Sequence, residues 1–244
     1  MTTHKENYTF FDGIKDGIPI CLGYLSVAFA FGIFSLNNGL NILQTVLISM
    51  TNVTSAGQLA AVPIIALGGG LTELALAQFV INLRYALMSI SLSQKLDKGV
   101  GLIHRFIISF VNTDEVFAVA SSKRSLLRKE YLYGLILTPY LGWCTGTLLG
   151  ASAGNILPQI VISALGIAIY GMFIAIVVPD VRENKSTALC VLLSIVLSCM
   201  FYYIPLLSKV PKGFTVIICA VVASSVFAVL APIPTTEVEG DSNV

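Results

Sequence analysis

The chain has 244 residues, of which 56% are hydrophobic and only 11% are charged, and its mean hydropathy is +0.87. A soluble domain carries roughly 25% charged residues, so a water-soluble fold is excluded and the lipid bilayer is expected to surround the chain. A net charge of +1 and a pI near 7.6 also argue against nucleic acid as a partner.

Hydropathy predicts an all-α polytopic membrane protein, because a transmembrane helix needs roughly 20 mostly apolar residues. The hydrophobic segments cover residues 18–36, 42–67, 74–93, 102–120, 131–153, 156–179, 187–207 and 214–233. The fourth segment has a polar middle, so we count about 7–8 segments. We expect a single transmembrane domain over residues 1–233 and a polar tail over 234–244.

An internal repeat of three segments is indicated by the spacing. The first three segments and the fifth to seventh begin 113, 114 and 113 residues apart, and five of nine residues are identical between 41–49 and 155–163. Repeat 1 then covers about 18–93 and repeat 2 about 131–207, linked by 102–120 and followed by 214–233. The repeats are parallel if the linking segment spans the membrane, and inverted if it dips and returns.

Three arrangements distribute the loop Lys and Arg residues differently. A non-spanning fourth segment with an outside N-terminus places nine in the cytoplasm and four outside, whereas a spanning one with an inside N-terminus places eight and five. Re-entrant segments at 42–67 and 156–179, with an inside N-terminus, place eleven and two. All three arrangements put Lys123, Arg124, Arg128 and Lys129 in the cytoplasm.

The second segment has a polar centre, "MTNVTSAGQ", that includes Ser55, Gly57 and Gln58. Irregular backbone at membrane depth must be buried in protein or line a watery cavity. We predict a helix break near Ser55 to Gly57, whose positive half-helix end could bind a carboxylate. The alternative is close packing of continuous helices at small residues.

The third segment places Gln78, Asn82 and Tyr85 on one helical face, which hydrogen bonding between helices would also explain. Arg84 lies off this face and either snorkels to the interface or pairs with Asp114 or Glu115, the opposite charges at similar depth.

The fourth segment carries Asp114 and Glu115 within "FVNTDEVFAVA". A charge at membrane depth costs about 2.5–3.5 kcal/mol on insertion scales. The polar run 112–115 therefore suggests a re-entrant or unwound element, although solvation at the interface is an alternative. These carboxylates could hold a substrate ammonium group, shuttle a proton or neutralise Arg84.

Enzymatic chemistry is not expected. No lysine lies deep in an apolar segment and His104 lies only at a segment edge, so a base for a nucleophile is not expected. No CxxC motif accompanies the five cysteines and no GxxxxGK[ST] loop is present, so neither a metal, a cofactor nor ATP is predicted.

Five motifs in order resemble the AzlC family, the large subunit of bacterial branched-chain amino-acid permeases. They are "GIPICLGYLSVAFAFG" from Gly17, "SAGQ" at 55–58, "NLRY" at 82–85, "TDE" at 113–115 and "WCTGTLLG" at 143–150. The resemblance covers about residues 13–230. Its matching positions are Ala56, Gly57, Gln58, Asn82, Arg84, Asp114, Glu115, Trp143 and Gly146.

The resemblance implies a multi-pass protein of the bacterial plasma (inner) membrane. It would export valine, leucine, isoleucine and perhaps methionine or analogues, together with a small hydrophobic AzlD-like membrane subunit. Asn52, Thr54 and Ser55 depart from the more apolar family pattern, which bears on the substrate. A subunit or channel for another small polar metabolite, or a scaffold for a transporting partner, is the alternative.

The expected substrate site combines the broken second segment, the third segment and the polar run of the fourth segment. A zwitterionic amino acid would place its carboxylate near Gly57 or Arg84 and its ammonium group near Asp114 or Glu115. The site residues predicted on this basis are Ser55, Gly57, Gln58, Asn82, Arg84, Asp114 and Glu115.

Overall fold

The computed structural model describes residues 8–153 and 181–231, together with 158, 160, 164, 174 and 177–179. These residues form helices and loops, with one isolated bridge between Leu96 and Leu127. Within the described residues, four helices are long and apolar enough to cross a membrane: Phe10–Asn37, Leu71–Ser93, Lys185–Tyr203 and Gly213–Leu230. The predicted all-α membrane class is therefore confirmed.

Contacts divide the chain into two units, residues 1–174 and 175–244, which we describe separately. The first unit contains α1 (Phe10–Asn37), α2 (Ile42–Thr51), α3 (Ser55–Ala66), α4 (Leu71–Ser93), α5 (Leu102–Phe110), α6 (Asp114–Ser122) and α7 (Lys129–Ala153). The second contains α9 (Lys185–Tyr203), the 3-10 turn η1 (Leu207–Lys209) and α10 (Lys212–Leu230). Most of the predicted segment 156–179 and the tail 234–244 lie outside the described residues, so the predicted repeat, segment count and single domain stay predictions.

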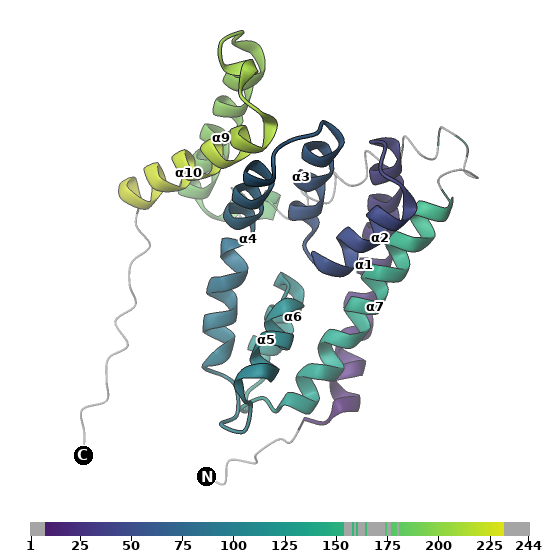
Figure 1. The fold of residues 1–244 in the computed structure, drawn as a ribbon. Helices are drawn as coiled ribbons and strands as arrows, with labels where there is room; N and C mark the ends of the chain where they lie inside the picture. Colours follow the sequence, from purple (N-terminus) through teal and green to yellow (C-terminus); the bar gives the residue numbers. More distant parts are fainter. Residues whose placement is uncertain are drawn as a thin grey trace. The chain divides into compact units, whose positions relative to one another are not determined.

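Helices α1 and α7 pack in parallel along their lengths (Figure 1). Glycines on α7 allow this close approach, because a Cβ at Gly134 would strike the carbonyl of Phe10 and one at Gly150 would strike that of Phe29. Small residues have this role at many helix contacts in membranes. The contacts advance together along both helices, so both begin at the same end of the unit.

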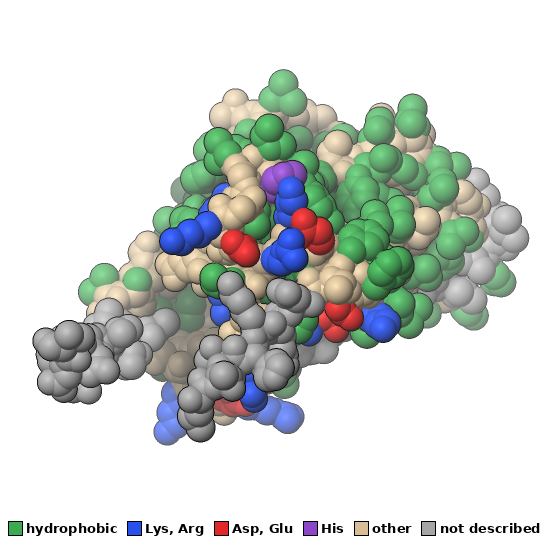
Figure 2. All heavy atoms as spheres, turned by 90° about the horizontal axis from the view of Figure 1, so that it is seen from below, with side chains coloured by type: hydrophobic (Ala, Val, Ile, Leu, Met, Phe, Trp, Pro, Cys, Tyr) green, Lys and Arg blue, Asp and Glu red, His purple; other side chains and the backbone are tan. Residues whose placement is uncertain are grey.

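That end carries a network of charged side chains, which we call the charged end. Lys123 Nζ lies 2.7 Å from the Asp16 carboxylate, and Tyr131 donates a hydrogen bond of 2.7 Å to the same group. Lys95 Nζ donates to the carbonyls of Ser121 and Lys123. The starts of α1 and α7 and the ends of α4 and α6 therefore meet here, and charged side chains gather on the face seen in Figure 2.

The second hydrophobic segment enters from the opposite end and returns to it. Near the end of α1, the hydroxyls of Ser35 and Thr45 are 2.8 Å apart. At the end of α2, the Met50 carbonyl accepts a hydrogen bond of 3.1 Å from Tyr140, half-way along α7. Helix α3 then turns back, because Val62 belongs to the apolar cluster at the end of α1.

The fourth hydrophobic segment enters from the charged end and returns to it. His104 Nδ1 lies 2.6 Å from the Tyr133 hydroxyl near the start of α7, whereas the ring of Phe110 approaches that of Tyr140 further along the same helix. Helix α6 then returns, and Lys95 caps its last turn at the charged end. Residues 102–120 therefore dip and return, as the re-entrant alternative predicted.

Of the three predicted arrangements, the structure agrees with the third over residues 8–153. The first is wrong because Asp16, near the start of the chain, pairs with Lys123. The second is wrong because Lys95 reaches the same end as Lys123. Helices α2–α4 are two short helices followed by a long one, and α5–α7 have the same order but start from the opposite end of the unit. The two re-entrant elements, α2–α3 and α5–α6, meet half-way along α1, α4 and α7 (Figure 1).

This topology predicts which loops share a side of the membrane. In a variant whose own cysteines are replaced, single cysteines at Asn37 and Gly70 should react with a membrane-impermeant maleimide from one side. Single cysteines at Lys98 and Arg124, which are also exposed, should react only from the other side. Labelling of positions 70 and 98 from the same side would show that α4 does not cross and would contradict the topology.

Candidate functional site

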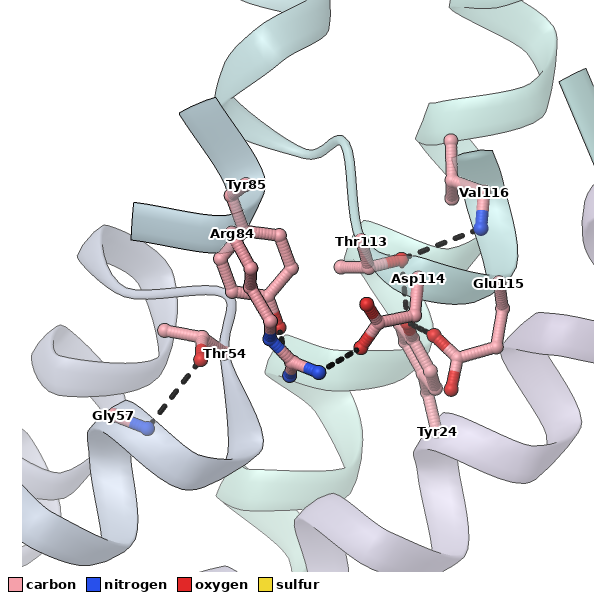
Figure 3. Close-up of polar contacts among 9 residues, drawn as sticks. All are labelled: Tyr24, Thr54, Gly57, Arg84, Tyr85, Thr113, Asp114, Glu115 and Val116. Carbon is pink, nitrogen blue, oxygen red and sulfur yellow. Dashed lines mark hydrogen bonds and ion pairs between the residues drawn. The ribbon is translucent and has the colours of Figure 1, made fainter. Parts of the chain in front are cut away.

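Each re-entrant element is interrupted by three non-helical residues, 52–54 in the first and 111–113 in the second. Threonine caps the helix that follows each break, since the Thr54 hydroxyl accepts from the Gly57 amide at 3.3 Å and the Thr113 hydroxyl from the Val116 amide at 3.4 Å (Figure 3). Such caps stabilise a helix by about 1 kcal/mol. The predicted break in the second segment is confirmed, beginning at Asn52, just before the predicted position.

Gln78 on α4 holds the first break in place. Its side-chain amide donates to the Gly57 carbonyl at 2.8 Å, and its carbonyl accepts from the side-chain amides of Asn52 at 3.0 Å and Asn82 at 3.1 Å. The Gly57 carbonyl can only accept, so it orients Gln78 and, through Gln78, Asn82. The carbonyl oxygen of Asn82 is therefore turned away from Gln78.

A polar cavity of about 170 Å³ lies where the two breaks meet. Both breaks and α4 contribute to its walls, which are formed by Thr51, Asn52, Val53, Thr54, Asn82, Tyr85, Ser109, Phe110 and Asn112. Asn112 is 2% exposed and its side-chain amide donates to Ser89 at 3.1 Å. Among the described residues, the carbonyl oxygens of Asn82 and Asn112 are buried without a hydrogen-bond donor.

Arg84 and Asp114 form the ion pair that the sequence suggested. Arg84 Nη1 lies 2.9 Å from the Asp114 carboxylate, and its other terminal nitrogen donates to the Tyr85 hydroxyl at 3.0 Å (Figure 3). Both charged side chains are about half exposed, at 48% and 43%. The pair therefore joins α4 to the first turn of α6 beside the cavity, and each charge neutralises the other.

Glu115 has a different partner. The Tyr24 hydroxyl, from the middle of α1, donates to the Glu115 carboxylate and also lies 2.6 Å from the Thr113 hydroxyl (Figure 3). The Tyr24 ring in turn packs edge-on against Trp143 of α7, with centroids 5.0 Å apart. Glu115 thus fastens the second break to the α1–α7 pair.

Gln58 and Ser55 lie away from the polar cavity. Both line a separate space of about 10 Å³ beside Trp143. Gln58 is fully buried and donates to Ser49 at 2.8 Å, and Ser49 lies 2.7 Å from the Thr147 hydroxyl of α7. The two residues therefore sit in the packing between the first re-entrant element and the long helices.

Of the predicted site residues, Asn82 lines the polar cavity, Arg84 and Asp114 lie beside it, and Gly57 and Glu115 hold the breaks. Asn112, Thr54 and Tyr24 were not among the predicted site residues. Asn112 and Thr54 are polar residues within apolar segments, and Tyr24 lies in the motif that begins at Gly17, where nothing set it apart from its neighbours. Within the described part of the chain, no group of three His, Cys, Asp or Glu side chains could hold a metal ion.

Comparison with known proteins gives a consistent set of relatives. A family model described as AzlC protein matches residues 19–157. The Inner membrane protein YgaZ of Escherichia coli (strain K12) is 30% identical over 195 residues, which cover 77% of this chain and 79% of that protein. An uncharacterized membrane protein of Archaeoglobus fulgidus is 33% identical over 190 residues, covering 77% and 83%. No solved structure matches the chain significantly.

The role of Gln78 can be tested by an isosteric substitution. Gln78→Glu replaces the donor to the Gly57 carbonyl by a carboxylate oxygen, which should destabilise the protein by about 1–3 kcal/mol because the hydrogen bond is lost and two acceptor oxygens face each other. Thermal unfolding of the purified protein in detergent measures this change. Gln94→Glu, at the exposed end of the same helix, is the matched control, and equal stability of the two variants would contradict the role.

Proposed function

This chain belongs to the AzlC family, whose membrane proteins point to a role in transport, and we propose that it is a secondary transporter of branched-chain amino acids. Valine, leucine and isoleucine are the proposed substrates, with methionine or analogues as further ones, and export is the proposed direction. The observation that carries the proposal is the small polar cavity between two broken helices, half-way along the long helices.

The position of this cavity supports transport rather than catalysis. In many transporters, substrate sites lie near the bilayer midplane, where discontinuous helices of two inverted repeats meet. Here α2–α3 and α5–α6 enter from opposite ends, and their breaks share one cavity. Movement of one re-entrant element relative to α1 and α7 would open the cavity to one side of the membrane or the other.

The polar groups of the cavity suit an ammonium group. The carbonyl oxygens of Asn82 and Asn112 are buried acceptors without a donor, and such groups cost free energy until they are paired. We expected Asp114 and Glu115 to hold the ammonium group. Arg84 and Tyr24 already engage these carboxylates, whereas Asn82 and Asn112 line the cavity, so we propose that these two side chains turn their carbonyl oxygens to the ammonium group when it binds.

The start of α3 suits a carboxylate. The positive end of a helix dipole lies at its N-terminus, and the first turn of α3, Ser55 to Gly57, carries no acidic residue. The first turn of α6 differs because it contains Asp114 and Glu115. Thr54, which begins α3, lines the cavity, so the cavity would receive a zwitterion with its carboxylate toward α3 and its ammonium group toward the asparagines.

We further propose that the protein acts in the bacterial plasma membrane, with a small AzlD-like subunit and with the proton gradient as its energy source. The carboxylate of Asp114 is the group proposed to connect proton movement with the Arg84 ion pair. Opening this pair would release α6 from α4 and allow the second re-entrant element to move.

The proposal is tested by exchange of radiolabelled valine in proteoliposomes that contain the full chain, with and without a co-expressed AzlD-like subunit. Unlabelled leucine and isoleucine should compete, and isovaleric acid, which is valine without its amino group, should not. Measuring the exchange at several pH values, with and without an imposed proton gradient, reports coupling. Failure of the wild-type protein to exchange any branched-chain amino acid in either preparation would reject the function.

The ion pair gives the corresponding prediction for variants. Arg84→Ala and Asp114→Ala should each abolish valine transport while the protein still inserts, because each leaves an unpaired charge at mid-depth. Arg128→Ala, which removes an exposed ion pair with Glu130, is the control and should transport normally. Full activity of both the Arg84→Ala and the Asp114→Ala variants would show that the ion pair has no part in transport.

A further inference from the structure

Phe110 separates two cavities of different chemistry. It lines the polar cavity described above and also an apolar cavity of about 710 Å³ between α5 and the α1–α7 pair, which is open to the outside of the protein because lining residues such as Phe106 are exposed. The apolar cavity is bordered by aromatic and aliphatic side chains, among them Phe106, Val111, Ile136 and Tyr140. Among the walls of these two cavities, Phe110 is the residue they share.

The second break explains this position. Phe110 is the last residue of α5, Val111 follows it toward the apolar cavity and Asn112 lines the polar one. The Phe110 ring lies 6.4 Å from that of Tyr140, which the Met50 carbonyl holds through its hydroxyl. Phe110 itself is 51% exposed, so its ring is held on one side only.

The size of the polar cavity makes Phe110 important for a substrate with an apolar side chain. Its volume of about 170 Å³ is close to the roughly 150 Å³ of an engineered cavity that holds benzene. An amino acid with a bulky apolar side chain would fill a cavity of this volume, so its side chain must lie against an apolar wall. Two apolar wall residues are Val53 and Phe110. Val53 is buried in the core, whereas the larger apolar cavity lies beyond Phe110.

We propose that Phe110 determines which side chains the transporter accepts, by contacting the end of the substrate side chain and closing the way into the apolar cavity. This inference rests on the proposed function. A shorter residue at position 110 joins the two cavities and admits longer side chains, whereas a larger residue restricts the site to shorter ones.

The test uses valine exchange in the same proteoliposomes, with alanine, valine, leucine and phenylalanine as competitors. Phe110→Ala should improve the competition by phenylalanine relative to valine by about tenfold, since each methylene in an apolar pocket changes specificity by about 10–200-fold. Phe110→Trp should weaken leucine relative to alanine by a similar factor. Because the two substitutions act in opposite directions, a general loss of activity cannot imitate the result.

Phe106→Ala is the matched control, because Phe106 lies on the same helix, is 69% exposed and borders only the apolar cavity. Its competition profile should equal that of the wild type. If the wild type exchanges valine but the Phe110 variants keep the wild-type order of competitors, Phe110 does not contact the substrate side chain and this inference alone is overturned. If the wild type exchanges no amino acid, the proposed function fails as well.

Discussion

Every backbone amide and carbonyl that a helix does not satisfy must find a partner inside the protein when lipid is the solvent. Two helix breaks at mid-depth create such groups, and a threonine within each break pairs with an amide of the helix that follows. Thr54 and Thr113 cap these helices, and Gln78 of α4 donates to the Gly57 carbonyl in the first turn of α3. The polar cavity exists because these partners gather around the breaks.

The α1–α7 pair provides the frame against which both re-entrant elements are placed. Glycine contacts bring the two backbones together, and the pair then presents Tyr24 from the middle of α1 and Tyr140 from the middle of α7. Tyr24 holds Glu115 of the second element, and Tyr140 holds the Met50 carbonyl of the first. Both breaks are thus fixed by hydrogen bonds to the same pair of long helices, which explains why they meet.

The two acidic residues of α6 illustrate how neighbours separate side chains that are adjacent in sequence. Asp114 faces Arg84 on α4, and Glu115 faces Tyr24 on α1. Successive helical residues point about 100° apart, so one residue reaches a helix on one side and the next reaches a helix on another. Helix α6 is therefore tied to α4 and to α1 by two adjacent residues.

From the sequence alone the membrane class was established, and the break in the second segment and the pairing of Arg84 with a carboxylate were predicted, each beside one alternative. Each followed from a cost that does not depend on the fold, namely that polar backbone and single charges are unfavourable in lipid. The direction of each segment came only from tertiary contacts. Hydropathy is the same for a segment that crosses and for one that turns back, and the loop charges allowed three arrangements. The different placements of Gln58 and Asn82, and the roles of Tyr24 and Phe110, were also decided by the tertiary structure, because they depend on which helix lies opposite each side chain.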